Sequence, residues 1–312
     1  MRPAFSVVFL TTLIGAGQGL FLALYSAEVM GALGRIAPPG PRFLHAGSWF
    51  AALLAGLGLL ASFFHLGRPE RAWRSAARWR TSWLAREVIA LPLFIAGVAA
   101  YGLAHRLPLG PPLAVGAFAL AACLALFVCT GMIYACIRFL QEWASPLTLA
   151  NFFLIGTASG FTVATALAAA FEPHVAGFFG RWAIVLTVVA LASRAISLAR
   201  NARLRPRSTP QSAIGVEGAR VEQKSMGFLG GSFNTREFFH GVSRGGLSVV
   251  KWAFIVLGFL VPMALLAAGL AAGSVALLVA APVVQYAGLV AERWFFLAQS
   301  NHPQNLYYQR TA

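Results

Sequence analysis

The chain has 312 residues, of which 59% are hydrophobic and only 11% are charged. Its apolar residues gather in runs of about 20, the length of a helix that crosses a bilayer, and this excludes soluble, disordered and collagen-like proteins. The net charge is +15, but no stripe of Lys and Arg alternates with aromatic residues in a soluble segment. We therefore predict no nucleic-acid partner.

Eight apolar runs predict an all-α fold, a polytopic membrane bundle of eight transmembrane helices that forms one domain over residues 1–312. Segments rich in proline and glycine separate the runs. The weakest break is Gly273-Ser274, which we accept because the two flanking runs together are too long for one span. The predicted spans are Phe5–Leu33, Phe43–Phe64, Trp83–Leu103, Leu113–Phe139, Leu147–Phe171, Trp182–Ala199, Leu247–Ala272 and Ser274–Ala298.

The basic residues divide unevenly between the two ends of these spans. Eight spans put both termini on one side, together with 20 of the 24 Lys and Arg residues. The positive-inside rule then predicts that both termini are cytoplasmic. A basic loop over residues 201–246 lies on that side. We predict that its first half, Arg203 to Pro210, is extended, and that its second half, Met226–Leu229 and Phe233–His240, lies on the membrane or grips a partner. The opposite side holds Arg35, Arg42, Arg106 and Arg181.

Small and polar residues inside the spans predict helix packing. The segment Gly15–Gly19 permits close helix approach, and its Gln18 can form a hydrogen bond across a helix interface. We expect Glu28 to be a structural or proton-path residue and Arg194 to reach the interface or form an ion pair. Three cysteines in one apolar run are expected to pack in the core, without a disulfide or a metal: Cys123, Cys129 and Cys136.

The histidines argue against a haem inside the membrane. A b-type haem held by two histidines requires both inside spans at matching depth, whereas all six here lie at span ends or in loops. We therefore predict no haem and no metal in this chain. The six are His45, His65, His105, His174, His240 and His302.

The segment between the second and third spans, residues 65–87, is the basic hinge, with six arginines and three tryptophans. Arg71, Arg74 and Arg78 are three and four residues apart, which predicts one face of a helix. The tryptophans suit a membrane interface. Two interpretations remain open: an interfacial helix with lipid-facing arginines, or a basic platform for another subunit.

Two acids lie near span ends. Glu87 is in the first turn of the third span, and Glu292 is about two turns from the end of the last. Burying an ionisable group costs roughly 2.5–3.5 kcal/mol on insertion scales, so such groups usually have a partner or a function. Either each acid pairs with its neighbour, Arg86 or Arg293, and locks helix packing, or the acids bind a neutral redox-active head group. Both interpretations stand for Glu87, whereas packing is favoured for Glu292.

Two motifs carry a resemblance to a known family. His65-Leu66-Gly67-x-Pro69, followed by Ser82-x-Leu84-x-x-Glu87, resembles the membrane-anchor subunit of dimethyl sulfoxide reductase. The opening Pro3–Gly19, and the ending Ala291–Phe296 with His302-Pro303-Gln304, are similar to a related branch. The basic loop and the charge partition fit the branch that serves cytoplasm-facing sulfite:quinone oxidoreductases.

The resemblance implies a subunit of the bacterial inner membrane whose docking face is cytoplasmic. Such anchors are not catalytic for the oxyanion or sulfur substrate. They hold an iron–sulfur electron-transfer subunit and a molybdopterin catalytic subunit, and they exchange electrons with ubiquinone or menaquinone. The resemblance implies that His65 and Glu87 belong to the quinone site. The match is looser for Arg68, Glu292 and Arg293, which it also places there. Docking of the partner is then expected at Arg71, Arg74 and Arg78.

The expected function is electron transfer between the quinone pool and the iron–sulfur partner, with sulfite oxidised and quinone reduced. One alternative is an anchor of the dimethyl sulfoxide reductase type that oxidises menaquinol. A membrane transporter and a purely structural anchor are the others. Besides the protein subunits, membrane lipid is the expected partner.

Overall fold

The computed structural model describes residues 1–216, 218, 220–222, 224, 238–303 and 305. Within these ranges the chain is helical, and eight helices are long and apolar enough to cross a membrane, which confirms the predicted number. They are α1 (Phe5–Ala32), α2 (Pro41–Phe63), α3 (Trp83–Ala104), α4 (Pro112–Ala135), α5 (Pro146–Phe171), α6 (Pro173–Ala202), a continuous helix of α9 (Arg244–Ile255), the π-helical turn η2 (Val256–Leu260) and α10 (Val261–Ala272), and α11 (Val275–Ala298).

Proline sets several helix starts, since the N–H that it lacks has no partner in the first turn of a helix. The sixth span begins at Pro173, directly after its N-cap Glu172, and not at the predicted Trp182. Residues 173–181 extend the helix, and the prediction missed them because His174, Arg181 and two glycines interrupt the apolar run there. The fourth span ends at Ala135 rather than at Phe139, and Cys136 caps it. Cys136 is exposed, so core packing was a wrong prediction for that cysteine.

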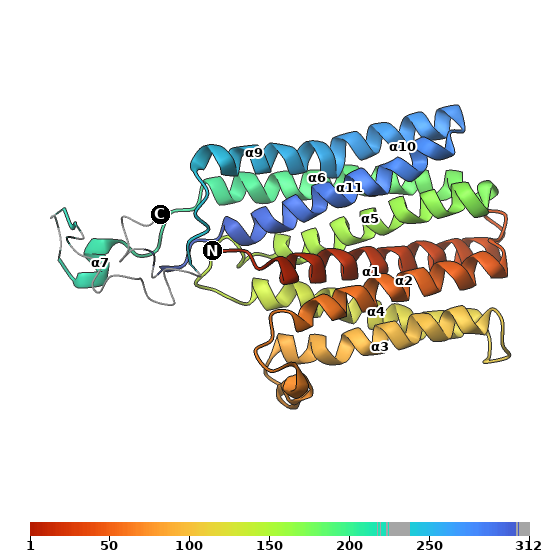
Figure 1. Ribbon diagram of the computed structural model, residues 1–312, viewed down its shortest axis with the longest axis horizontal. Helices are drawn as coiled ribbons and strands as arrows, with labels where there is room; N and C mark the ends of the chain where they lie inside the picture. Colours follow the sequence, from red (N-terminus) through yellow and green to blue (C-terminus); the bar gives the residue numbers. More distant parts are fainter. Residues whose placement is uncertain (217, 219, 223, 225–237, 304, 306–312) are drawn as a thin grey trace.

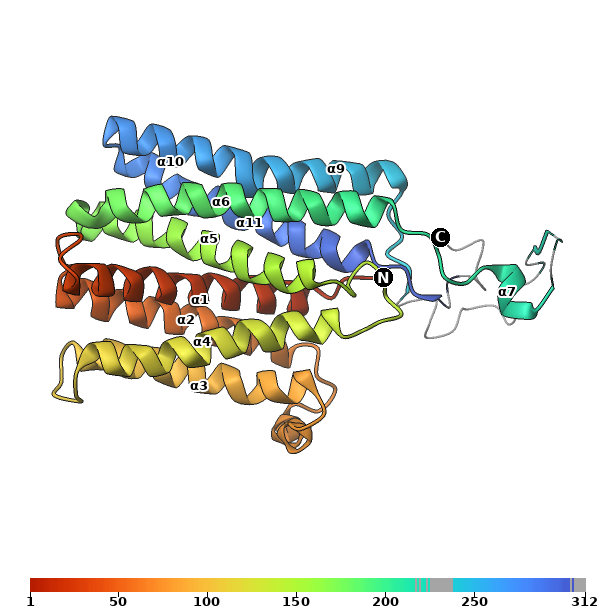
Figure 2. The same cartoon turned by 180° about the vertical axis from the view of Figure 1, so that it is seen from behind.

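The helices run side by side, with α1 and α5 in the middle of the bundle (Figures 1 and 2). Helices α2 to α4 lie on one side of this pair, and α6, α9, α10 and α11 lie on the other. The two central helices touch through their backbones: a Cβ atom on Gly160 would lie 1.9 Å from the carbonyl carbon of Gly19. Gln18 Nε2 donates to the Cys123 carbonyl of α4 at 2.9 Å. Both findings confirm the packing predicted for the first span.

The basic hinge folds differently from the prediction. Pro69–Arg78 forms a 3₁₀ helix, η1, which has no buried residue. It stands beside the start of α3 (the orange coil in Figure 1). In a 3₁₀ helix, residues three apart share a face and residues four apart do not. Arg71 and Arg74 therefore share a face, whereas Arg78 points elsewhere, and the predicted single face of three arginines was wrong.

Arg86 fastens the hinge to α3. Its guanidinium donates to the carbonyl of Trp79 at 2.8 Å and to that of Arg80 at 2.9 Å. The same group lies 4.1 Å from the centre of the Trp83 ring. Arg86 is thus a tether of the hinge rather than the ion-pair partner of Glu87.

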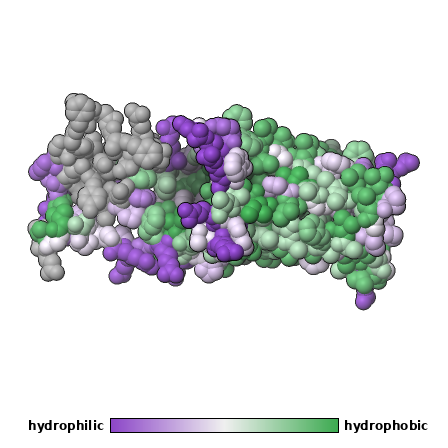
Figure 3. Space-filling model, turned by 90° about the horizontal axis from the view of Figure 1, so that it is seen from below, coloured by the Kyte–Doolittle hydropathy of each residue, from purple (hydrophilic) through white to green (hydrophobic). Residues whose placement is uncertain are grey.

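The 201–246 loop is described only in part. Arg203 to Thr209 contains no helix or strand, whereas Pro210, which was predicted to be extended, begins a short helix, α7 (Pro210–Ile214). The predicted contact segment Met226–Leu229 and residues 233–237 lie outside the described residues. The loop and Met1 are at the same end of the bundle (Figure 1), which we call the loop end. A hydrophilic band closes one end of the apolar surface (Figure 3).

Candidate functional site

The predicted site residues divide into an exposed group and a buried group. His65 and Arg68 belong to the first, in the connection after α2. Neither side chain forms a hydrogen bond or an ion pair with another described residue. Neighbouring atoms shield part of the His65 ring, and this desolvation lowers its pKa. His65 is therefore readily neutral, in contact with water, and not bonded to Glu87.

Glu87 is buried, with 7% of its surface exposed, in the first turn of α3. Ser82 fixes the start of this helix, because its hydroxyl oxygen accepts from the Ala85 N–H at 3.3 Å. The carboxylate then meets α4, where the Thr130 hydroxyl donates a short hydrogen bond to it. Glu87 thus has a neutral partner that can pass on a proton, rather than a cation that would hold it ionised.

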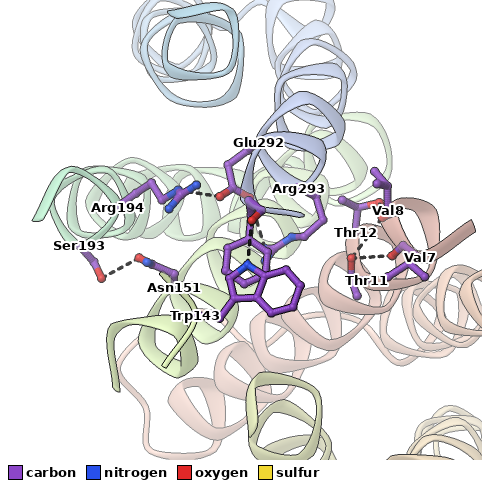
Figure 4. A network of polar contacts seen from close by, with 11 residues as sticks. Val7, Val8, Thr11, Thr12, Trp143, Asn151, Ser193, Arg194, Glu292 and Arg293 are labelled. Carbon is purple, nitrogen blue, oxygen red and sulfur yellow. Dashed lines mark hydrogen bonds and ion pairs between the residues drawn. The ribbon is translucent and has the colours of Figure 1, made fainter. Parts of the chain in front are cut away.

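Glu292 lies in a buried charge cluster with Arg194 and Arg293 (Figure 4). The Arg194 Nε atom lies 2.7 Å from one carboxylate oxygen of Glu292, and Arg293 lies 3.5 Å from the other. The pair joins α6 to α11, and each side chain of the pair is 1% exposed. This contact supports the packing interpretation of Glu292 and resolves the alternatives for Arg194 in favour of an ion pair. Two guanidinium groups against one carboxylate leave the cluster with one surplus positive charge.

The surplus cation, Arg293, faces a small cavity between α1, α4, α5 and α11. Its guanidinium carbon lies 3.9 Å from the centre of the Phe152 ring, and its Nε atom has no hydrogen-bond partner in the described part of the chain. The cavity has about 20 Å³ of room for water. Its polar lining residues are Thr11, Thr12, Gln18, Thr130, Ser159 and Arg293. Because Thr130 is among them, Glu87 is one hydrogen bond away from the cavity.

The wall offers few free donors. The Thr11, Thr12 and Ser159 hydroxyls donate to backbone carbonyls of their own helices, and the Gln18 amide donates to α4. Among the described polar groups of the wall, the Arg293 guanidinium and the second N–H of the Gln18 amide are therefore still free to donate, whereas the hydroxyl oxygens and the Gln18 carbonyl oxygen can still accept. A ligand that suits this wall both accepts from a cation and donates to neutral oxygens.

The comparison with protein families shows which family the chain belongs to. The family model described as the DMSO reductase anchor subunit (DmsC) matches residues 1–298. The chain belongs to this anchor family. It is also 51% identical, over 325 aligned positions that cover both chains completely, to a sulfite dehydrogenase subunit of Allochromatium vinosum. The resemblance stated from the His65–Glu87 motif is thus confirmed, and so is the branch that it indicated. Family and helices together make this chain an integral membrane protein.

The residue types of this DmsC-family chain suit a quinone, but the cavity volume suits water. The carbonyl oxygens of a quinone are acceptors that match the Arg293 donor, and the hydroxyl groups of its reduced form are donors that match the threonine oxygens. About 20 Å³ holds about one water molecule, so a ring enters only if lining side chains move apart. Among the described residues, no group of three or more His, Cys, Asp or Glu side chains is placed to hold a metal.

A second polar cluster of this anchor protein lies at the opposite end of the bundle. The Tyr101 hydroxyl donates to Glu28 at 2.6 Å, and the carboxylate is 3.6 Å from His105 Nε2. Burial and, less strongly, the nearby His45 lower the pKa of His105. Glu28 is therefore a bonded carboxylate in a setting similar to that of Glu87, but at the other end of the helices.

Proposed function

We propose that this chain is the quinone-reactive membrane anchor of a sulfite oxidoreductase in the bacterial inner membrane. The similarity to a sulfite dehydrogenase subunit supports the substrate class, and a protein that is one subunit of an enzyme implies further chains. The proposed partners are an iron–sulfur electron-transfer subunit and a molybdopterin catalytic subunit at the loop end, on the cytoplasmic side. Electrons then pass from the partner to the quinone pool.

The observation that carries the quinone site is the path from Glu87 through Thr130 to the cavity of Arg293. When bound, a quinone supplies two-electron, two-proton chemistry. Arg293 is the residue that would donate to one of its oxygens, and the surplus positive charge of the cluster would stabilise negative charge at that oxygen. Glu87 holds the proton, and the Thr130 hydroxyl passes it toward the cavity.

The exposed residues take supporting roles in this proposal. His65 exchanges protons with water near the start of α3, since its lowered pKa makes the neutral ring available at pH 7. Arg68 adds positive charge beside it. Arg71, Arg74 and Arg78 of η1 form a docking face for the iron–sulfur partner, with Arg78 on a separate side of the 3₁₀ helix.

The test compares two carboxylates of the same chain. Glu87→Gln removes the proton carrier and keeps the shape, so quinone-linked sulfite oxidation should fall at least about 100-fold, with the complex still assembled. The matched control is Glu28→Gln, which also leaves an amide opposite a hydroxyl donor. The control should retain most turnover.

Two results would count against the proposal. Full turnover in Glu87→Gln would remove Glu87 from the site, and an equal loss in Glu28→Gln would indicate general damage. A purely structural anchor predicts a third pattern, in which the purified complex holds no quinone and Arg293→Gln changes nothing. A transporter predicts purification without iron–sulfur or molybdenum subunits.

A further inference from the structure

An open groove at the loop end has no role in the quinone chemistry. Its volume is about 500 Å³, within the roughly 300–1,000 Å³ typical of binding pockets. Three connections meet around it: residues 138–142 after α4, residues 204–208 after α6, and residues 301–303 after α11. It is formed almost wholly by segments beyond the ends of the spans.

Two side chains hold this groove in shape. The Arg200 guanidinium donates twice to the Gln141 carbonyl, at 3.1 Å each, and once to that of Ala144 at 3.4 Å. The Gln141 side chain, with its amide oriented by these neighbours, donates to the Arg205 carbonyl and accepts from the Arg207 N–H, at 3.2 Å each. The stretch after α6 is thereby tied to the connection after α4, and the groove is preorganised.

The lining of the groove carries a strong positive charge. Arg138, Arg205 and Arg207 line it and are exposed. None of the three forms an ion pair or a side-chain hydrogen bond with a described residue, while Glu142 is the acid in the lining. Arginine's planar group favours carboxylates, which it can bind through two parallel hydrogen bonds. The preferred ligand is therefore anionic.

The position of the groove favours a protein over a lipid. Asn201, in the last turn of α6, is its only lining residue that belongs to a described helix. The rest of the lining follows helix ends, and Ser208 and Asn301 add neutral polar groups that suit a peptide backbone. A headgroup ligand would instead sit where lipid-facing apolar surface borders the arginines.

From these observations we propose that the groove is a second docking site, which takes an acidic segment of the soluble partner subunit. It is distinct from the docking face of η1, which lies beside α3. The inference rests on the proposed function, because it needs a soluble partner at the loop end. Two separate basic contacts would fix both the position and the rotation of that partner on the anchor.

The experiment uses the complete complex, purified through a tag on this chain, and measures partner retained over a salt series. Arg205→Glu with Arg207→Glu should reduce retention about 10-fold or more, since like charges then face the acidic segment. Arg205→Lys with Arg207→Lys should keep part of the binding. The matched control is Arg42→Glu with Arg106→Glu, two exposed arginines that line a pocket at the opposite end; it should retain the partner.

Each outcome has one meaning. If the groove variant and the Arg42/Arg106 control variant both lose the partner, the loss reflects a general effect of charge. That result would refute the groove as a docking site. Full retention in the groove variant would also overturn it, and would leave the proposed function standing if the wild-type complex still holds its partners. Loss of bound anionic phospholipid, measured by native mass spectrometry, with the partner retained would make the groove a lipid site and refute the proposal. A wild-type chain that retains no partner would refute the proposed function itself.

Discussion

The buried charge cluster and the basic hinge use arginine in opposite ways. Inside the bundle, Arg194 and Glu292 are each 1% exposed and pair at 2.7 Å, because an unpaired ion costs several kcal/mol away from water. On the hinge, Glu70 pairs with Arg71 at 3.8 Å, and both side chains are well exposed; such pairs contribute little. Each interior arginine therefore contributes through its own ion pair. The hinge arginines contribute together, through a shared positive electrostatic potential that salt screens.

The largest effect should come from unbalancing the interior cluster. Glu292→Gln leaves two guanidinium groups buried without an acid, and should lower the free energy of unfolding by about 3–5 kcal/mol. Arg194→Met leaves Glu292 with Arg293 and should be milder. Thermal unfolding of the two purified variants in detergent measures the difference. Equal losses would mean that Arg293 does not share the carboxylate.

The next effect concerns Thr130. Thr130→Val removes the hydroxyl from Glu87 and keeps the volume, and a hydrogen bond to a charged group is worth about 1.5–3 kcal/mol. Quinone-linked turnover should fall about 10- to 100-fold, and Thr130→Ser should restore most of it. A serine variant as impaired as the valine variant would argue that shape, not the hydroxyl, matters here.

A smaller effect is expected at His65. Because the ring is exposed, water can replace it, and His65→Gln should reduce turnover by less than about 10-fold at pH 7. Its lowered pKa means that the ring protonates only as the pH falls, so the difference from wild type should shrink below that pKa. A loss of turnover as large as that of Glu87→Gln would mean that water cannot replace His65 and that His65 acts with the buried residues of the site.

The smallest effect should come from Arg86. Arg86→Lys cannot form both hydrogen bonds to the hinge carbonyls, and should loosen η1 by about 0.5–1.5 kcal/mol. Hydrogen–deuterium exchange of residues 69–82 reports this directly. Exchange as slow as in wild type would show that the Trp83 contact alone holds the hinge.

The fold was largely predictable because span length and hydrophobicity are local properties of the sequence. Helix ends were less predictable: Pro173 begins a helix whose first turns contain His174, Arg181 and two glycines, which interrupt the apolar run. The prediction for the hinge failed for a different reason. Arginines spaced by three and four residues fit an α-helix, and the sequence pattern does not show that this segment forms a 3₁₀ helix.

The site was predictable in residue type but not in pairing. Glu292 beside Arg293 indicated an ion pair, and an arginine in an apolar run, Arg194, was itself a signal. That these two meet depends on how α6 packs on α11. Thr130 carried no signal, because hydroxyls in apolar helices usually bond to their own backbone. His65 and Glu87 lie at the two ends of the hinge, yet their side chains do not bond.

The contact of Gly19 with Gly160 bears on the size of the head group that the proposed quinone site of this chain could take. A Cβ on Gly19 would lie 2.1 Å from the Gly156 carbonyl oxygen, and Gly15 and Gly156 line the cavity. One side of the cavity is therefore bare main chain that is locked in place, and side-chain replacement cannot shift it. If this cavity takes the proposed quinone, a larger or smaller ring must be accommodated by lining side chains such as Leu289 and Phe127, whose ring lies against Gly156. Those two positions are where chains of this family adapted to different quinones should diverge first.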